Sequence, residues 1–197
     1  AELHYLIQPY TLPVVKNNPY IDQIIFDRTT AEATDVSLPV FAKYIAEARY
    51  DYILDVYSKL GTAFLCLPSS AKSIGYKKWY TQFVYNKTIS YLKKPKTKAG
   101  LAIENRLRLL QILPGNFPDS LKPTIYLTAE EKNKALQFLS EAEIDTEAPI
   151  FMIGLLGSAP NKTYPLEYLA HLLEVLVQER PEAQILLNYI PSQKEAV

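Results

Sequence analysis

The residues best placed to do chemistry lie in a short loop, GSAPNKTYP, at positions 157–165. An apolar run at 150–155 precedes this loop, and an amphipathic helical pattern follows it. A loop between a buried strand and a helix N-terminus is the usual ligand position in open α/β sheets, and the helix N–H groups attract anions. Gly157 permits close backbone approach, Ser158 offers a hydroxyl and Lys162 adds a full positive charge. The loop is therefore a candidate phosphate or diphosphate site.

An ordinary strand-to-helix connection with a solvated lysine is the alternative interpretation of this loop. The loop is not a P-loop, because that motif requires Gly-Lys-Ser/Thr and here Asn161 precedes Lys162 and Thr163. Pro160 also removes a backbone donor from the middle of the loop. The pattern thus disfavours an ATPase and leaves the anion site and the plain connection both open.

Lysines and aromatic residues are concentrated in two neighbouring stretches, KSIGYKKWY at 72–80 and KKPKTK at 93–98. Lys+Arg and Asp+Glu both total 21 in the chain, so this is a local excess within a neutral protein. It predicts contact with an anionic acceptor or an anionic membrane surface, near which each lysine contributes about 1 kcal/mol. Two solvated loops are the alternative.

A carboxylate stands at the end of a strand pattern. Asp55 closes the apolar segment 52–56, at the edge where ligands of open α/β sheets bind. It can act on a substrate there, and a capped or paired aspartate is an equal alternative. Cys66 is the only cysteine and is predicted to be a buried apolar residue. No Cys/His cluster has the spacing of metal ligands, so no metal is expected.

The composition limits the classes of function. A neutral charge balance disfavours a dedicated nucleic-acid binder, and no partner of that kind is expected. The sequence has no apolar run approaching the ~20 residues needed to span a bilayer, and no visible signal peptide. With a single cysteine, these features predict a cytoplasmic protein.

Strand and helix patterns alternate along the chain, which predicts an α/β fold with parallel sheets. The run at 150–155 is expected to be a strand covered on both faces, and TAEE at 128–131 is expected to cap a helix. The predicted strands are 3–7, 21–26, 52–56, 72–76, 124–127, 150–155 and 184–187, and the predicted helices are 37–48, 59–67, 99–113, 128–143 and 164–180.

Three prolines at 114–123 separate two such alternating runs. We therefore predict two Rossmann-like units, 1–122 and 123–197. The second is expected to be incomplete, because a β-α-β unit alone rarely forms a stable domain. Its open strand edges and apolar face predict self-association.

Taken in order, several stretches resemble the ADP-heptose:lipopolysaccharide heptosyltransferases, glycosyltransferase family 9, of GT-B fold. The resemblance runs along nearly the whole chain. The stretches are NPYIDQIIFDR (18–28), YDYILDVYSKLGTAFL (50–65), AKSIGYKKW (71–79), AIENRLRLL (102–110), LTAEEKNKALQFL (127–139) and IGLLGSAPNKTYPLEYLAHLL (153–173).

This resemblance implies transfer of heptose from ADP-heptose to the inner core of lipopolysaccharide in Gram-negative bacteria, with no cofactor beyond the nucleotide sugar. It implies that Ser158 and Lys162, with Gly157, contact the donor diphosphate in the C-terminal domain. The acceptor belongs to the N-terminal domain, and Asp55, Lys59, Lys77 and Lys78 are the acceptor-side candidates, at the inner face of the inner membrane.

The family's Gly-Asp loop, with its presumed catalytic carboxylate, is expected before Ala1, and the ribose-binding acid after Val197. We therefore expect an inactive fragment with no catalytic residue of its own. Where the family often has Gly and Arg/Lys in its acceptor loop, this sequence has Ser58 and Gly61. Where the family has a Glu-Arg pair in a later helix, this sequence has Glu104-Asn105, with Arg106 one position on. These departures leave room for a different acceptor. Two alternative functions stay open: a GT-B enzyme with another nucleotide sugar, and a non-catalytic module that binds an anionic glycan or phosphate through residues 72–98.

Overall fold

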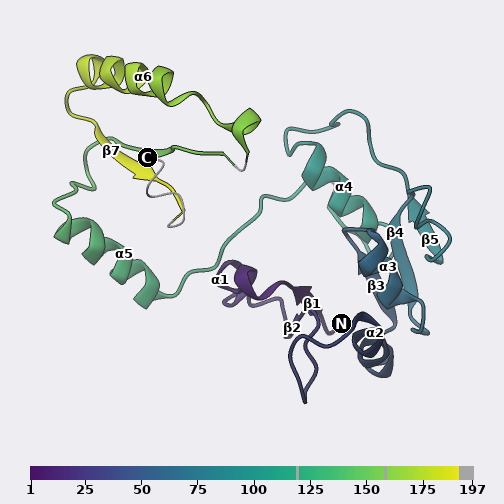
Figure 1. The fold of residues 1–197 in the computed structure, drawn as a ribbon. Helices are drawn as coiled ribbons and strands as arrows, with labels where there is room; N and C mark the ends of the chain where they lie inside the picture. The colour runs from purple at the N-terminus through teal and green to yellow at the C-terminus, as the bar shows by residue number, and fades with distance from the viewer. Residues whose placement is uncertain (119, 158, 191–197) are drawn as a thin grey trace. The chain divides into compact units, whose positions relative to one another are not determined.

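The computed structural model describes residues 1–118, 120–157 and 159–190 (Figure 1). The chain folds as two compact units, Ala1–Tyr126 and Leu127–Val197. We predicted a division after residue 122, close to this boundary. Each unit is described by itself below.

Unit 1 is an alternation of strands and helices in which every strand pairing is parallel. β1 pairs with β2, and β3, β4 and β5 form a sheet in that order. This confirms the predicted α/β class with parallel sheets. In chain order the elements are β1 (His4–Ile7), η1 (Pro9–Thr11), α1 (Leu12–Val15), β2 (Gln23–Phe26), α2 (Leu38–Glu47), β3 (Tyr52–Asp55), α3 (Leu60–Cys66), β4 (Lys72–Tyr76), β5 (Lys87–Ile89) and α4 (Leu101–Leu110).

Helices cover both faces of the β3–β4–β5 sheet. Ile53 packs against the cluster that contains Phe41 of α2, whereas Leu54 packs with Ile74 and with Leu109 of α4. Successive side chains of a strand point to opposite faces, so a strand between two helical layers is apolar on both sides. This explains the apolar run that predicted β3.

Unit 2 is smaller and contains one pair of parallel strands. Its elements are α5 (Ala129–Glu141), β6 (Ile150–Gly154), η2 (Pro160–Lys162), α6 (Leu166–Glu179) and β7 (Gln184–Asn188), and β6 pairs with β7. The predicted capping box is confirmed: Thr128 Oγ1 accepts the Glu131 N–H at 3.1 Å, and the Glu131 carboxylate accepts the Thr128 N–H at 2.9 Å. Two orphan donors of α5 are thereby satisfied.

Two predictions for these segments are wrong. Residues 124–127 form no strand: the Tyr126 carbonyl accepts an amide N–H of Asn17 at 3.2 Å, and among the described residues no strand pairs with this segment. β6 is not covered on both faces, since Phe151 is 39% exposed and Met152 is 70% exposed. The apolar run at 150–155 therefore predicted the strand correctly and its burial wrongly. Nothing in the described part of unit 2 covers the Phe151 and Met152 side chains. Self-association stays a prediction.

Within residues 1–118, 120–157 and 159–190, no helix has the length and apolar character needed to cross a bilayer.

Candidate functional site

The carboxyl ends of β3 and β4 lie together at one edge of the sheet, because Asp55 and Gly75 are register partners in a parallel pair. The loop after β3 carries Lys59, and the loop after β4 carries Lys77 and Lys78. The four acceptor-side candidates are thus brought to one sheet edge, the position where ligands of open α/β sheets bind.

Asp55 is engaged by its own loop and by Tyr85. One carboxylate oxygen accepts the N–H groups of Tyr57 at 3.0 Å and Ser58 at 2.7 Å, and the other accepts the Tyr85 hydroxyl at 2.7 Å. The residue is only 7% exposed. Of the two interpretations offered by the sequence, this geometry favours the capped aspartate, which positions the loop.

Ser58 closes the same loop onto the neighbouring strand. Its φ of 48° lies in the left-handed region that favours glycine. Its buried hydroxyl donates to the Asp55 carbonyl and accepts the Tyr76 N–H, both at 2.8 Å. These two hydrogen bonds offset the backbone strain, which accounts for a serine in a conformation that favours glycine.

Tyr85 is a site residue that the sequence did not reveal. Its ring lies over Gly75, where an added Cβ would come within 2.6 Å of the ring carbons. Burial raises the pKa of the Tyr85 phenol, and the hydrogen bond to Asp55 raises it further, so the hydroxyl stays protonated and donates. An isolated glycine inside a strand pattern marks such close approaches, so Gly75 was the available signal.

Two of the lysines at this edge meet at Tyr57. Lys78 Nζ donates to the Tyr57 carbonyl at 2.7 Å, and Lys59 Nζ lies 4.7 Å from the centre of the Tyr57 ring. Lys77 is exposed, and its backbone N–H donates to the Ile89 carbonyl at the end of β5. The edge therefore presents positive charge, with the Lys78 ammonium held by a hydrogen bond and the Lys59 ammonium lying over the Tyr57 ring.

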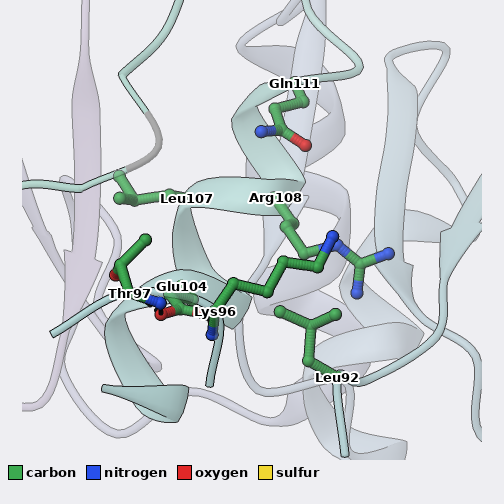
Figure 2. A pocket seen from close by; sticks show the side chains of 7 residues that line it. All are labelled: Leu92, Lys96, Thr97, Glu104, Leu107, Arg108 and Gln111. Carbon is green, nitrogen blue, oxygen red and sulfur yellow. Dashed lines mark hydrogen bonds between the residues drawn. The ribbon is translucent and has the colours of Figure 1, made fainter. Parts of the chain in front are cut away.

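A buried carboxylate of α4 holds the lysine-rich loop 93–98. Glu104 accepts the N–H of Lys96 at 2.7 Å, and the N–H and hydroxyl of Thr97 at 2.6 and 2.7 Å. These hydrogen bonds, the Lys96 N–H first, hold the pKa of Glu104 below its ordinary value. Figure 2 shows the small pocket, about 160 Å³, around this contact. Its lining residues are Leu92, Lys96, Thr97, Glu104, Leu107, Arg108 and Gln111.

Asn105, the next residue, anchors the start of the same loop. Its side-chain oxygen accepts the Leu92 N–H at 2.8 Å, and its amide donates to the Leu101 carbonyl at 2.8 Å. Arg106 is exposed. Glu104 and Asn105 thus have a structural role, because they hold the loop that carries the lysines at 93–98.

Cys66 is the last residue of α3 and is buried in a cluster with Ala63 and Tyr85. It is 5% exposed, which confirms the predicted buried residue. Burial raises the pKa of the thiol to about 12, with a smaller contribution from the charge of Asp55. The protonated thiol is a poor nucleophile, so chemistry at Cys66 is disfavoured.

The loop after β6 is closed by backbone contacts. The Gly157 N–H donates to Thr163 Oγ1 at 3.0 Å, and that hydroxyl donates to the Ala159 carbonyl at 3.0 Å. A Cβ on Gly157 would lie 2.2 Å from the Lys162 carbonyl oxygen. Gly157 therefore permits close approach of the loop's own backbone, a role that the sequence did not distinguish from approach to a ligand.

The candidate donor site also includes Ser158 and Lys162. Ser158 lies outside the described residues. Lys162 ends η2 with an exposed side chain, just before α6, whose N-cap position is Pro165. Unit 2 thus brings Gly157 and Lys162 together beside the N-terminus of a helix of 14 residues.

Comparisons with known proteins give the family. The family model of glycosyltransferase family 9 (heptosyltransferase) matches residues 40–197, well over half of the chain. No curated protein sequence matches significantly. The fold is similar to that of a family 9 glycosyl transferase from Veillonella parvula DSM 2008, with a TM-score of 0.74 and 18% identity. It is also similar to that of E. coli ADP-heptose lps heptosyltransferase II, with a TM-score of 0.65 and 18% identity.

Both solved structures are longer than this chain. All of this chain is covered in each comparison, and it spans 56% and 57% of the two structures. At this identity the likeness establishes a shared GT-B-like fold, whereas the family assignment rests on the match over residues 40–197. The chain belongs to glycosyltransferase family 9.

Proposed function

We propose that the chain forms part of the machinery that transfers a heptose from ADP-heptose to an inner-core acceptor of lipopolysaccharide. The observation that carries this proposal is the family match, which extends from α2 through both units to the end of the chain. The similarity in fold to a protein named as an ADP-heptose heptosyltransferase supports the choice of donor.

On this proposal the donor diphosphate binds at the loop after β6. The diphosphate gains negative charge as the sugar leaves, and groups that stabilise this charge lower the barrier. Lys162 supplies a cation and the N-terminus of α6 supplies partial positive charge. Gly157 shapes the loop, and Ser158 is assigned a hydroxyl contact with the diphosphate.

The acceptor binds at the edge that carries Lys59, Lys77 and Lys78, with Asp55 as a positioning residue. Lysines suit a phosphorylated acceptor because each is a mobile point charge with three donors. Since Asp55 already accepts three hydrogen bonds, we assign the general base to no residue of this chain. No metal and no further cofactor enters this proposal.

Titration calorimetry of the 197-residue chain with ADP-heptose tests the donor assignment. Lys162→Ala is expected to weaken binding by about tenfold, the effect of losing one charge-assisted contact. Lys132→Ala, an exposed lysine on α5 of the same unit, is the matched control and is expected to bind the donor unchanged.

Other outcomes identify the competing functions. Tighter binding of a different nucleotide sugar would replace heptose as the donor while leaving the glycosyltransferase in place. Glycan binding that is indifferent to Lys162, with no nucleotide binding, would favour the non-catalytic module. We expect no turnover by the 197-residue chain alone. Robust product formation would instead assign the general base to a residue of this chain.

A further inference from the structure

Tyr57 is an exposed aromatic residue in the loop after β3, at the carboxyl edge of the β3–β4 pair. It is 63% exposed and lies two positions beyond Asp55, the last residue of β3. Single aromatic side chains are common on protein surfaces, so exposure alone indicates no ligand. Tyr57 differs from such residues in its fixed backbone and in the cations beside its ring.

The backbone of Tyr57 is held on both sides of its Cα atom. Its N–H donates to the Asp55 carboxylate at 3.0 Å, and its carbonyl accepts Lys78 Nζ at 2.7 Å. The next residue, Ser58, is fixed by its buried hydroxyl, which accepts the Tyr76 N–H at 2.8 Å. These hydrogen bonds use no atom of the Tyr57 ring, so the fold presents the ring without depending on it. A side chain on a backbone that is already ordered loses less entropy when it binds a ligand.

Cations surround the Tyr57 ring. Lys59 Nζ lies 4.7 Å from the ring centre, within the ~6 Å range of a cation–π contact, and covers one face of the ring. Lys78 uses one of its three donors on the Tyr57 carbonyl, and the exposed Lys77 precedes it in the loop after β4. An exposed aromatic ring with cations beside it suits a ligand that has both an apolar face and a negative charge.

We propose that Tyr57 is a specificity-determining residue of the acceptor site, on which the pyranose ring of an anionic sugar stacks. The C–H groups on one face of a pyranose carry partial positive charge, and they meet the negative face of the aromatic ring. The phosphate or carboxylate of the sugar then lies against Lys77 and Lys78. This inference rests on the proposed function, which places the acceptor at this edge, and it adds that the acceptor is bound by its ring as well as by its charge.

Paired probes separate recognition of the ring from recognition of the charge. The 197-residue chain is titrated with glucose 6-phosphate and with glycerol 3-phosphate, which carries the same phosphate without a sugar ring. Glucuronate and glycerate form the corresponding carboxylate pair. Amide shifts in NMR spectra give the affinities, and we expect the sugar of each pair to bind about fivefold more tightly than its ring-free partner. The pair with the higher affinity identifies the charged group that the site prefers.

Variants of Tyr57 test whether its ring provides this difference. Tyr57→Ala is expected to bind both sugars about fivefold more weakly and both ring-free anions unchanged, because only the stacking is lost. Its urea unfolding midpoint should not move, since the hydrogen bonds of Tyr57 are made by its backbone. Tyr57→Phe keeps the ring and should bind the sugars as the unchanged chain does. Tyr20→Ala, 71% exposed just before the amino end of β2, is the matched control and should also bind them unchanged.

Equal affinities for the sugar and its ring-free partner in both pairs would overturn the inference. So would an equal loss of sugar binding in Tyr57→Ala and Tyr20→Ala, or a loss in Tyr57→Ala that extends equally to the ring-free anions. Calorimetry with ADP-heptose is a separate readout that depends on Lys162. Donor binding that persists while the sugars ignore Tyr57 would overturn this inference alone. Absence of donor binding while the sugars still depend on Tyr57 would overturn the proposed reaction and retain the sugar site.

Discussion

The loop after β3 and the loop after β6 occupy equivalent places, each joining a parallel strand to a helix at the carboxyl edge of a sheet. In unit 1 the loop is held by two buried side chains, Asp55 and Ser58, which accept hydrogen bonds from the loop itself, from β4 and from Tyr85. In unit 2 the loop is held by the close approach of two backbone segments at Gly157 and by one threonine hydroxyl.

This difference separates two ways of shaping a site. A loop built on buried side chains is stabilised by the core beneath it, so its substitution costs global stability. A loop closed through backbone contacts over an exposed strand, where Met152 is 70% exposed, can change shape with little effect on the rest of the unit. The following changes test this contrast, from the largest expected effect to the smallest.

Asp55→Ala should have the largest effect. The substitution leaves the Tyr57 and Ser58 N–H groups and the Tyr85 hydroxyl without their acceptor, which is expected to lower the free energy of unfolding by about 3 kcal/mol. Asp51→Ala, an exposed aspartate just before β3, is the matched control. Urea unfolding followed by circular dichroism gives both values, and equal losses would contradict the capping role.

Gly75→Ala should come next, because the new methyl group would lie 2.6 Å from the Tyr85 ring. We expect a loss of about 2 kcal/mol as the ring is displaced from Asp55. Gly61→Ala has open space around its Cβ and lies in α3, so it should stabilise the unit by up to about 1 kcal/mol. The two unfolding midpoints should therefore move in opposite directions, and a shared direction would refute this account.

Gly157→Ala should act on the loop after β6 more than on unit 2 as a whole. The added Cβ would meet the Lys162 carbonyl at 2.2 Å, so the loop must open, at a cost of about 1 kcal/mol. Gly154→Ala, with nothing within 4 Å of its Cβ, is the control. Amide exchange at Gly157 and Lys162 should rise in the first variant alone. A global loss as large as that of Asp55→Ala would remove the contrast between the two loops.

Glu104→Gln should have the smallest effect, seen as a change in pH dependence. Because the pKa of Glu104 is lowered in the folded state, its ionised form stabilises the fold above the ordinary value of 4.5. That contribution is lost as the pH falls through the lowered pKa. The variant should be less stable near neutral pH and respond less to acid, as measured by urea midpoints. Glu47→Gln, in an exposed pair with Lys43, should respond to acid as the unchanged chain does.

Elements with a strong local pattern were predictable from the sequence. The periodicity of α2 and α4, the apolar run of β3 and the capping box of α5 each predicted an element that lies within a few residues of its expected position. β5 was missed because its three residues are too short to show a pattern. Residues 124–127 were predicted wrongly because an apolar stretch does not reveal whether a partner strand lies beside it.

The candidate acceptor site in unit 1 was predictable only in part. The sequence placed Lys59, Lys77 and Lys78 near the ends of strands, and the parallel register brings those ends together. It did not reveal Tyr85, which reaches Asp55 across 30 residues, because only the packing of the Tyr85 ring over Gly75 creates that contact.

By itself the sequence determined the alternation of strands and helices, the concentration of lysine in a neutral chain and the resemblance to a family, since each depends on local pattern or composition. Only the tertiary structure decided what Asp55 and Gly157 do. A carboxylate at a strand end can cap a loop or face a ligand, and a glycine can admit a ligand or its own backbone. Burial and contacts between residues distant in the sequence distinguish these roles.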